Sequence, residues 1–151
     1  MIRQRIARFE RIYRAREAEL DQRMTELARR RAEEDAHRRR LEAAREMRHR
    51  AEADFMSLCG TVSARDMWMM RSSIDLAAQE VESAGSDLSR CMEEIERTME
   101  AVTESHRDLK VLESFMGRLR SRLAAEESRV EQSMLDEMAL RLRGGGVLDE
   151  A

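Results

Sequence analysis

The strongest constraint on the fold of this chain is a seven-residue repeat in its second half. Ten successive positions spaced seven residues apart are apolar: Met67, Ile74, Val81, Leu88, Ile95, Val102, Leu109, Met116, Leu123 and Val130. The companion positions, three residues later, are mostly small, as at Ala77, Ala84 and Cys91. A period of 3.5 residues is that of a left-handed coiled coil. The repeat predicts a helix from about residue 64 to about 142 that pairs along a narrow seam.

A weaker stripe with the same period precedes this helix. It consists of Ile6, Tyr13, Leu20, Leu27, Leu41 and Phe55, with Ile2, Phe9 and Leu58 beside it. Glu34 and Arg48 interrupt the stripe, and residues 28–40 are nearly all charged or alanine. The chain contains no proline, which would break or kink such a helix. We expect a first helix over about residues 2–58.

The five residues CGTVS, at positions 59–63, separate the two stripes. Gly60 suits a helix C′ position, where φ is positive. Ser63 followed by Asp66 resembles a capping box that starts a new helix. We therefore expect an all-α fold in which two long helices form an antiparallel coiled-coil hairpin, with its turn near residues 59–63.

The expected hairpin is a single domain of residues 1–143, and its arms are unequal. A pivot in the middle of the turn pairs Ile6 with Met116 and residue 1 with residue 121, although matching stripes would tolerate a half-heptad shift. The segment from Arg122 onward then has no partner within the chain, yet it still carries an apolar stripe. Such a stripe implies a partner elsewhere. We expect the helix to stop at the glycines that follow, leaving residues 144–151 as a flexible glycine-rich tail.

The net charge of −3 conceals a division between the two parts of the chain. Residues 1–50 hold sixteen arginines against ten acidic residues, a net of +6, and the remainder holds twelve basic against twenty-one acidic residues, a net of −9. This asymmetry favours mutual pairing of the two helices. The dense runs Arg29–Arg31 and Arg38–Arg40 lie beside acidic residues and lack interleaved aromatics, so we interpret them as a solvated helix face, with nucleic-acid or anion binding as a minor alternative.

No pattern of catalytic or ligating residues stands out. The three histidines have no ligand spacing, and Cys59 and Cys91 would lie too far apart along a hairpin to share a disulfide or a metal. There is no phosphate loop, and a solvated rod offers no desolvated cleft in which to tune carboxylates. We expect no enzyme activity, no cofactor and no metal. No apolar run approaches the ~18 residues of a membrane span, and the N-terminus lacks the apolar core of a signal peptide, so we expect a cytoplasmic protein without direct membrane insertion.

Several segments resemble one family of secretion proteins. The stretch HRDLKVLESFMGRLRSRLAAEESRVEQSMLDEMALR is similar to the C-terminal region of the FliJ family. The matching residues are Lys110, Leu112, Glu113, Arg118, Glu126, Glu127, Glu131, Gln132, Asp136, Glu137 and Ala139. The N-terminal RIARFERIYRAREAELDQ, together with Leu58, Gly60, Val62 and Ser63 of the turn, resembles the same family and its injectisome branch, YscO/SctO.

This resemblance implies a central stalk of a type III secretion (injectisome) export apparatus. In such proteins the paired terminal helices enter the hexameric export ATPase and promote its activity, while the other end reaches the cytoplasmic domain of the export gate. Some members bind secretion chaperones. The implied location is cytoplasmic and peripheral to the inner-membrane export apparatus. A generic coiled-coil scaffold or adaptor that self-associates is the alternative.

Two sets of residues are candidate contacts for these partners. The set at the turn, for the export gate or a chaperone, is Phe55, Met56, Leu58, Val62, Trp68 and Met69. The set at the terminal end, for the ATPase, is Ile2, Ile6, Leu123, Val130, Met134, Leu135 and Met138. Met67 and Met70 fall on the seam, so we expect them in the core. Trp68 and Met69 fall off the seam and either offer an adaptable contact or cover the open end of the hairpin.

Overall fold

The computed structural model describes the backbone of residues 1–58 and 60–148 and the side chains of these residues up to 145. These residues form two helices, α1 (Ile2–Met56) and α2 (Ala64–Leu148), and contain no strand. The chain divides into two compact units. The terminal unit is Met1–Leu20 with Ser105–Ala151, and the turn unit is Asp21–Glu104. The predicted all-α hairpin of two long helices is confirmed.

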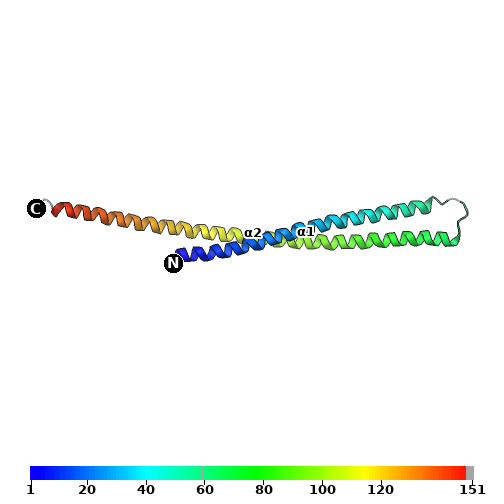
Figure 1. The fold of residues 1–151 in the computed structure, drawn as a ribbon, viewed down its shortest axis with the longest axis horizontal. Helices are drawn as coiled ribbons and strands as arrows, with labels where there is room; N and C mark the ends of the chain where they lie inside the picture. The colour runs from blue at the N-terminus through cyan, green and yellow to red at the C-terminus, as the bar shows by residue number, and fades with distance from the viewer. Residues whose placement is uncertain (59, 149–151) are drawn as a thin grey trace. The chain divides into compact units, whose positions relative to one another are not determined.

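In the turn unit, α1 and α2 run antiparallel and are joined by the turn (Figure 1). The helix α1 ends at Met56, two residues earlier than expected, so Gly60 lies within the turn rather than at a C′ position. Gly60 has a φ of 93°, a left-handed backbone conformation that residues with a side chain rarely adopt. The Ser63 hydroxyl accepts a hydrogen bond from the Asp66 amide at 3.2 Å, so this serine caps α2. Cys59 lies outside the described residues.

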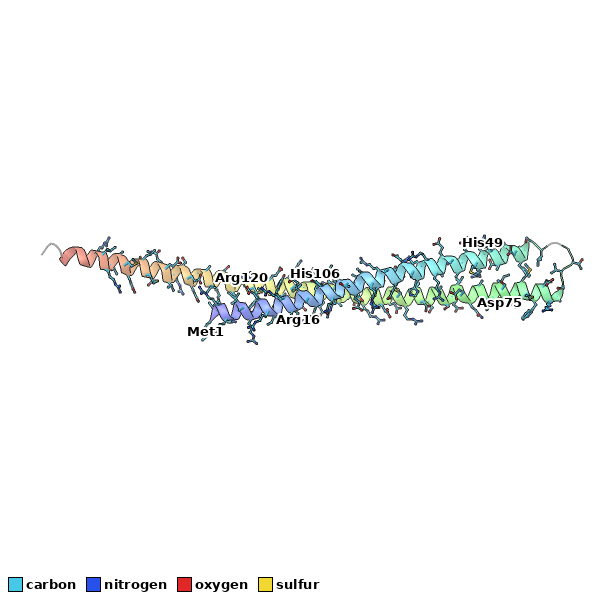
Figure 2. All side chains as sticks on the ribbon, viewed as in Figure 1. Met1, Arg16, His49, Asp75, His106 and Arg120 are labelled. Carbon is cyan, nitrogen blue, oxygen red and sulfur yellow. The ribbon has the colours of Figure 1, made fainter. Side chains whose placement is uncertain are left out.

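The seam of the turn unit follows the seven-residue repeat. Ala84 is fully buried, Cys91 and Ile95 are buried, and α1 contributes Leu41 and Ala44 to the core of this unit. A small residue at Ala84 lets the two backbones approach closely, as expected for a seam with alanine at companion positions. Figure 2 shows His49 and Asp75 at about the same level on the two helices, which fits the antiparallel pairing.

Met67 departs from this pattern. It is 47 % exposed, so the expectation that it lies in the core is wrong, whereas Met70 is half-buried. The cause is the early end of α1 at Met56: the first turn of α2 has no helical residue opposite it to complete the seam.

The terminal unit contains its own core, formed by Ile6 and Leu20 of α1 with Leu109, Met116 and Leu119 of α2. The rings of Phe9 and Phe115 meet edge to face, with centroids 4.8 Å apart. The expected register pairs residue 9 with residue 113, so the observed pairing is displaced by about two residues. Such a shift is within the half-heptad that matching stripes tolerate.

The start of α1 therefore reaches further along α2 than expected. Arg3 forms an ion pair with Glu127, and Met1, Ile2 and Arg3 border one notch with residues of α2 up to Glu131. The expectation that α2 loses its partner from Arg122 onward is wrong. The segment without an α1 partner, which we call the overhang, is residues 132–148.

The end of α2 also differs from expectation. The helix passes through Gly144–Gly146 and ends at Leu148 rather than near residue 142, and positive φ among the described glycines is confined to Gly60. A glycine lowers helix propensity by about 1 kcal/mol but, unlike proline, keeps its backbone donor. Weak helix formers at this end therefore do not stop the helix. Residues 149–151 of the expected tail lie outside the described residues.

Two glycines give opposite predictions for stability. Gly85→Ala should stabilise the protein by up to about 1 kcal/mol, because alanine is the better helix former and its Cβ would meet Leu41 Cδ1 at an ordinary 4.0 Å. Gly60→Ala should destabilise it by about 1 kcal/mol, because the left-handed conformation is strained for alanine. Urea unfolding followed by circular dichroism measures both. Equal effects of the two changes would contradict the structure.

Candidate functional site

The first candidate surface is an apolar stripe on the overhang. The side chains of Met134, Leu135, Met138 and Leu142 are between 59 % and 77 % exposed. Every described side chain from residue 132 to 145 is exposed, so nothing within the described chain covers this part of α2. A set of large apolar residues in this state is typical of a contact with another protein.

This stripe is not a continuation of the seam inside the chain. A step of seven residues from Val130 reaches Glu137, and the companion position is Ser133. Both are polar, so the series that pairs with α1 ends at Val130. Because α-helical residues advance by about 100° each, Met134 and Met138 lie on a face rotated away from that series. The overhang thus presents a new face, suited to a different partner.

The other expected ATPase contacts lie closer to α1. Ile6 is buried, with 8 % of its surface exposed, and belongs to the core of the terminal unit. Ile2 and Leu123 are half-buried and line the notch at the start of α1 with Val130, which is 59 % exposed. The hydrogen bond to Glu127, and then the charge of that carboxylate, raise the pKa of Arg3 beside the notch. Ile6 is therefore not available on the surface, whereas the overhang residues are.

The second candidate surface lies beside the turn. Trp68 is 70 % exposed and Met69 is 55 % exposed. Met56 and Leu58 are also exposed, whereas Phe55 and Val62 are half-buried. A tryptophan that covered the open end of the hairpin would be largely buried. The exposure of Trp68 therefore favours the interpretation of this residue as a contact.

The sequence analysis missed one member of this surface. Leu76 is 66 % exposed and lies seven residues after Met69, hence on the same face of α2, with Ser72 between them. The signal was available, because Met69 and Leu76 form an apolar pair two turns apart that falls outside the seam. We call Trp68, Met69 and Leu76 the turn patch.

Ion pairs between the helices replace apolar contacts where the stripe of α1 has few apolar residues. Arg30 pairs with Glu94 across the seam and with Glu26 on its own helix. Arg40 donates to Glu80 at 2.9 Å and to Asp87 at 2.8 Å. These carboxylates raise the pKa of both arginines. The basic α1 and the acidic α2 thus neutralise each other, as their opposite charges indicated.

A small polar cavity lies beside these ion pairs. It is lined by Glu33, His37, Asp87, Arg90, Cys91 and Glu94. The Cys91 thiol is buried and donates to the carbonyl oxygen of Arg30 at 3.7 Å. Burial and then the nearby Glu33, Glu34 and Glu94 raise its pKa, which makes it a poor nucleophile. Among the described residues, no group of three potential ligands is arranged to hold a metal ion.

The raised pKa of Cys91 gives a reactivity prediction. In a Cys59→Ser background, Cys91 should react with a thiol reagent such as DTNB at least tenfold more slowly in the native protein than in urea at pH 8. The ratio should shrink only as the pH rises above the raised pKa, where the thiolate forms without unfolding. Stopped-flow absorbance gives both rates. If Cys91 reacted as fast in the native protein as in urea, its contact with Arg30 would be open to solvent, contrary to the structure.

Comparison with known proteins identifies a family. The family model described as flagellar FliJ protein matches residues 4–145. No curated protein and no solved structure matches the chain. Within the described residues, no helix combines the length and apolar character of a membrane span.

Proposed function

Since the chain belongs to the FliJ family of flagellar and type III export stalk proteins, we propose that it is the central stalk that links a hexameric export ATPase to the export gate. In this proposal the overhang and the start of α1 enter the ATPase ring and promote its activity, and the turn patch meets the gate or a secretion chaperone. The protein acts by contact and not by chemistry of its own.

The observation that carries this proposal is the apolar stripe of the overhang. Its residues are exposed, they lie on a helix that α1 no longer accompanies, and they are out of phase with the seam. A ring with an apolar inner surface would bury them. The notch between Met1, Ile2 and Leu123 supplies a second apolar element next to the overhang. The notch residues would then support insertion, whereas Ile6 holds the helix pair together.

The turn patch supports a second contact, which lies beside the turn between α1 and α2. Tryptophan and methionine dominate many interfaces, because tryptophan buries a large area and methionine adapts its shape. Phe55 and Val62, half-buried beside the turn, would hold the patch in place. We assign Met56, Leu58, Trp68 and Met69 to the gate or chaperone contact and add Leu76 to them.

The finer placement in the injectisome branch is part of the proposal. It rests on the resemblance of the N-terminal helix and of Leu58, Gly60, Val62 and Ser63 to YscO/SctO. A protein of this branch would work in the cytoplasm at the inner-membrane export apparatus. Deletion of the gene should abolish secretion of effector proteins and leave swimming motility intact; loss of motility alone would assign the chain to a flagellar apparatus instead.

Removal of the overhang tests the ATPase contact. A chain truncated after residue 131 should keep its helical hairpin, with a thermal midpoint lowered only slightly, because the described side chains of residues 132–145 are all exposed. Stimulation of the cognate export ATPase should nearly vanish, because the proposed ring-facing stripe is gone. Circular dichroism and a phosphate-release assay measure the two outcomes.

A matched pair of full-length variants separates the stripe from the length of the helix. Met134→Gln with Met138→Gln should reduce stimulation strongly, whereas Leu140→Gln, which lies on another face and is 67 % exposed, should leave it near the original level. Full stimulation by the truncated chain would contradict this assignment. Loss of self-association with no effect on any ATPase would favour the coiled-coil scaffold instead.

Replacement of the turn patch tests the second contact. Trp68→Ala with Met69→Ala should weaken binding to the export-gate domain by roughly 30-fold, the effect of about 2 kcal/mol from interface anchors. Helix content should stay nearly unchanged, because the exposed side chains contribute little to folding. Binding is measured by isothermal titration, with Met92→Ala, another exposed methionine of the turn unit, as the control. If the double variant unfolds the hairpin, the two residues hold its end together and the contact is wrong.

A further inference from the structure

The outer face of α2 in the terminal unit carries a row of arginines. Arg107, Arg118, Arg122 and Arg129 are separated by eleven, four and seven residues, which places them within a narrow sector of the helix. Between the first two lies Val111, which is 68 % exposed.

Part of this row borders a groove between the two helices of the terminal unit. The groove is lined by Arg5 of α1 and by Ser114, Phe115, Gly117, Arg118, Leu119, Ser121 and Arg122 of α2. We call it the arginine groove. Its lining contains three arginines and no carboxylate, so it is the reverse of the notch at Met1, which has three glutamates and a single arginine.

The three arginines of the groove are not neutralised by the described residues. In the same unit, Arg3 pairs with Glu127 and Arg120 pairs with Glu10, whereas Arg5, Arg118 and Arg122 form no ion pair with any carboxylate that the structure describes. Arg118 and Arg122 are also one helical turn apart, where like charges repel. Glu126, one further turn along, is the nearest acid on this side of α2, and it pairs with neither. The groove therefore holds positive charge that an external anionic group can compensate.

The floor of the groove is apolar and open. Phe115 packs one side of its ring against Phe9 and remains 38 % exposed. Leu119 lies beside it and is buried. Gly117, two residues after Phe115, lies on nearly the opposite side of α2, beyond Arg118, and is not part of this floor. An apolar floor at Phe115 with a basic rim fits an apolar side chain flanked by carboxylates.

From these observations we propose that the arginine groove binds an acidic amphipathic helix of a partner protein. The partner would lay an apolar edge over Phe115 and direct Glu or Asp side chains to Arg5, Arg118 and Arg122, a helix-in-groove contact. The site goes beyond the proposed stalk function, because Met134 and Met138 lie on nearly the opposite face of α2 from Arg118.

A nucleic acid fits this surface less well than a protein helix. The lining contains a single aromatic ring, Phe115, and no row of aromatics on which successive bases could stack. Glu113, Glu126 and Glu127 of the same unit would repel the long backbone of a duplex. A short helix with carboxylates on its flanks presents its charge only where the arginines lie.

The test uses the full chain and a fluorescein-labelled synthetic peptide of about 21 residues, designed as a helix with one leucine stripe and glutamates on both flanks. A peptide of the same composition with the stripe scrambled, and a DNA duplex of about 20 base pairs, serve as comparisons. Fluorescence anisotropy should show binding of the amphipathic peptide that weakens with salt, and much weaker binding of the other two probes.

Two variants test the groove itself. Arg118→Gln with Arg122→Gln should weaken peptide binding about tenfold, the combined effect expected for two rim charges. The control, Arg90→Gln with Arg97→Gln, removes the same charge from exposed residues of the turn unit that pair with acids on their own helix. It should leave binding within about twofold of the original.

The proposal is overturned if the scrambled peptide or the duplex binds as well as the amphipathic peptide. It is also overturned if the two double arginine variants lose binding equally.

Discussion

Burial of a narrow apolar seam between α1 and α2 is the interaction on which the rest of this protein depends. Neither helix can cover its own stripe, and each has a hydrophilic remainder that keeps it from packing in any other way. In both units the buried side chains come from the two helices facing each other, as with Leu20 and Leu109 or with Leu41 and Ala84. Large apolar side chains outside the seam, such as those of Trp68 and Met134, are exposed. These candidate contacts therefore lie where the pairing of the two helices stops.

Ion pairs connect α1 and α2 where the seam has few apolar residues. The stretch of α1 around Arg30 and Arg40 has few large apolar residues, and its arginines reach across to Glu94, Glu80 and Asp87 instead. Charged pairs of this kind discriminate between partners more than they stabilise, because carboxylates in the wrong register would leave arginines unpaired. The arginine groove shows the opposite condition, in which cations remain without an acidic partner among the described residues.

The candidate contact surfaces of α2 are separate from one another. The overhang stripe, the turn patch and the arginine groove occupy different positions along the helix, and the stripe and the groove lie on different faces. A long helix can offer several contacts in this way, because each contact needs only one helix face and a few anchors. Membership of a stalk family gives a reason for such a division, since a stalk connects components of an assembly.

The amino-acid sequence by itself determined the helices, the seam and the turn, because a seven-residue repeat, an absence of proline and a serine cap leave few other ways to bury the apolar residues. It also indicated that Trp68 and Met69 would lie off the seam. Only the tertiary structure decided the register, since two stripes of equal period match at several offsets, and the observed one put Phe9 against Phe115 and Arg3 against Glu127. That register buried Ile6, moved the start of the overhang beyond Glu131, and left Met67 without a partner after α1 ended at Met56. The arginine groove depends on the same choice, because Arg5 reaches Arg118 and Arg122 only when α1 lies at this offset.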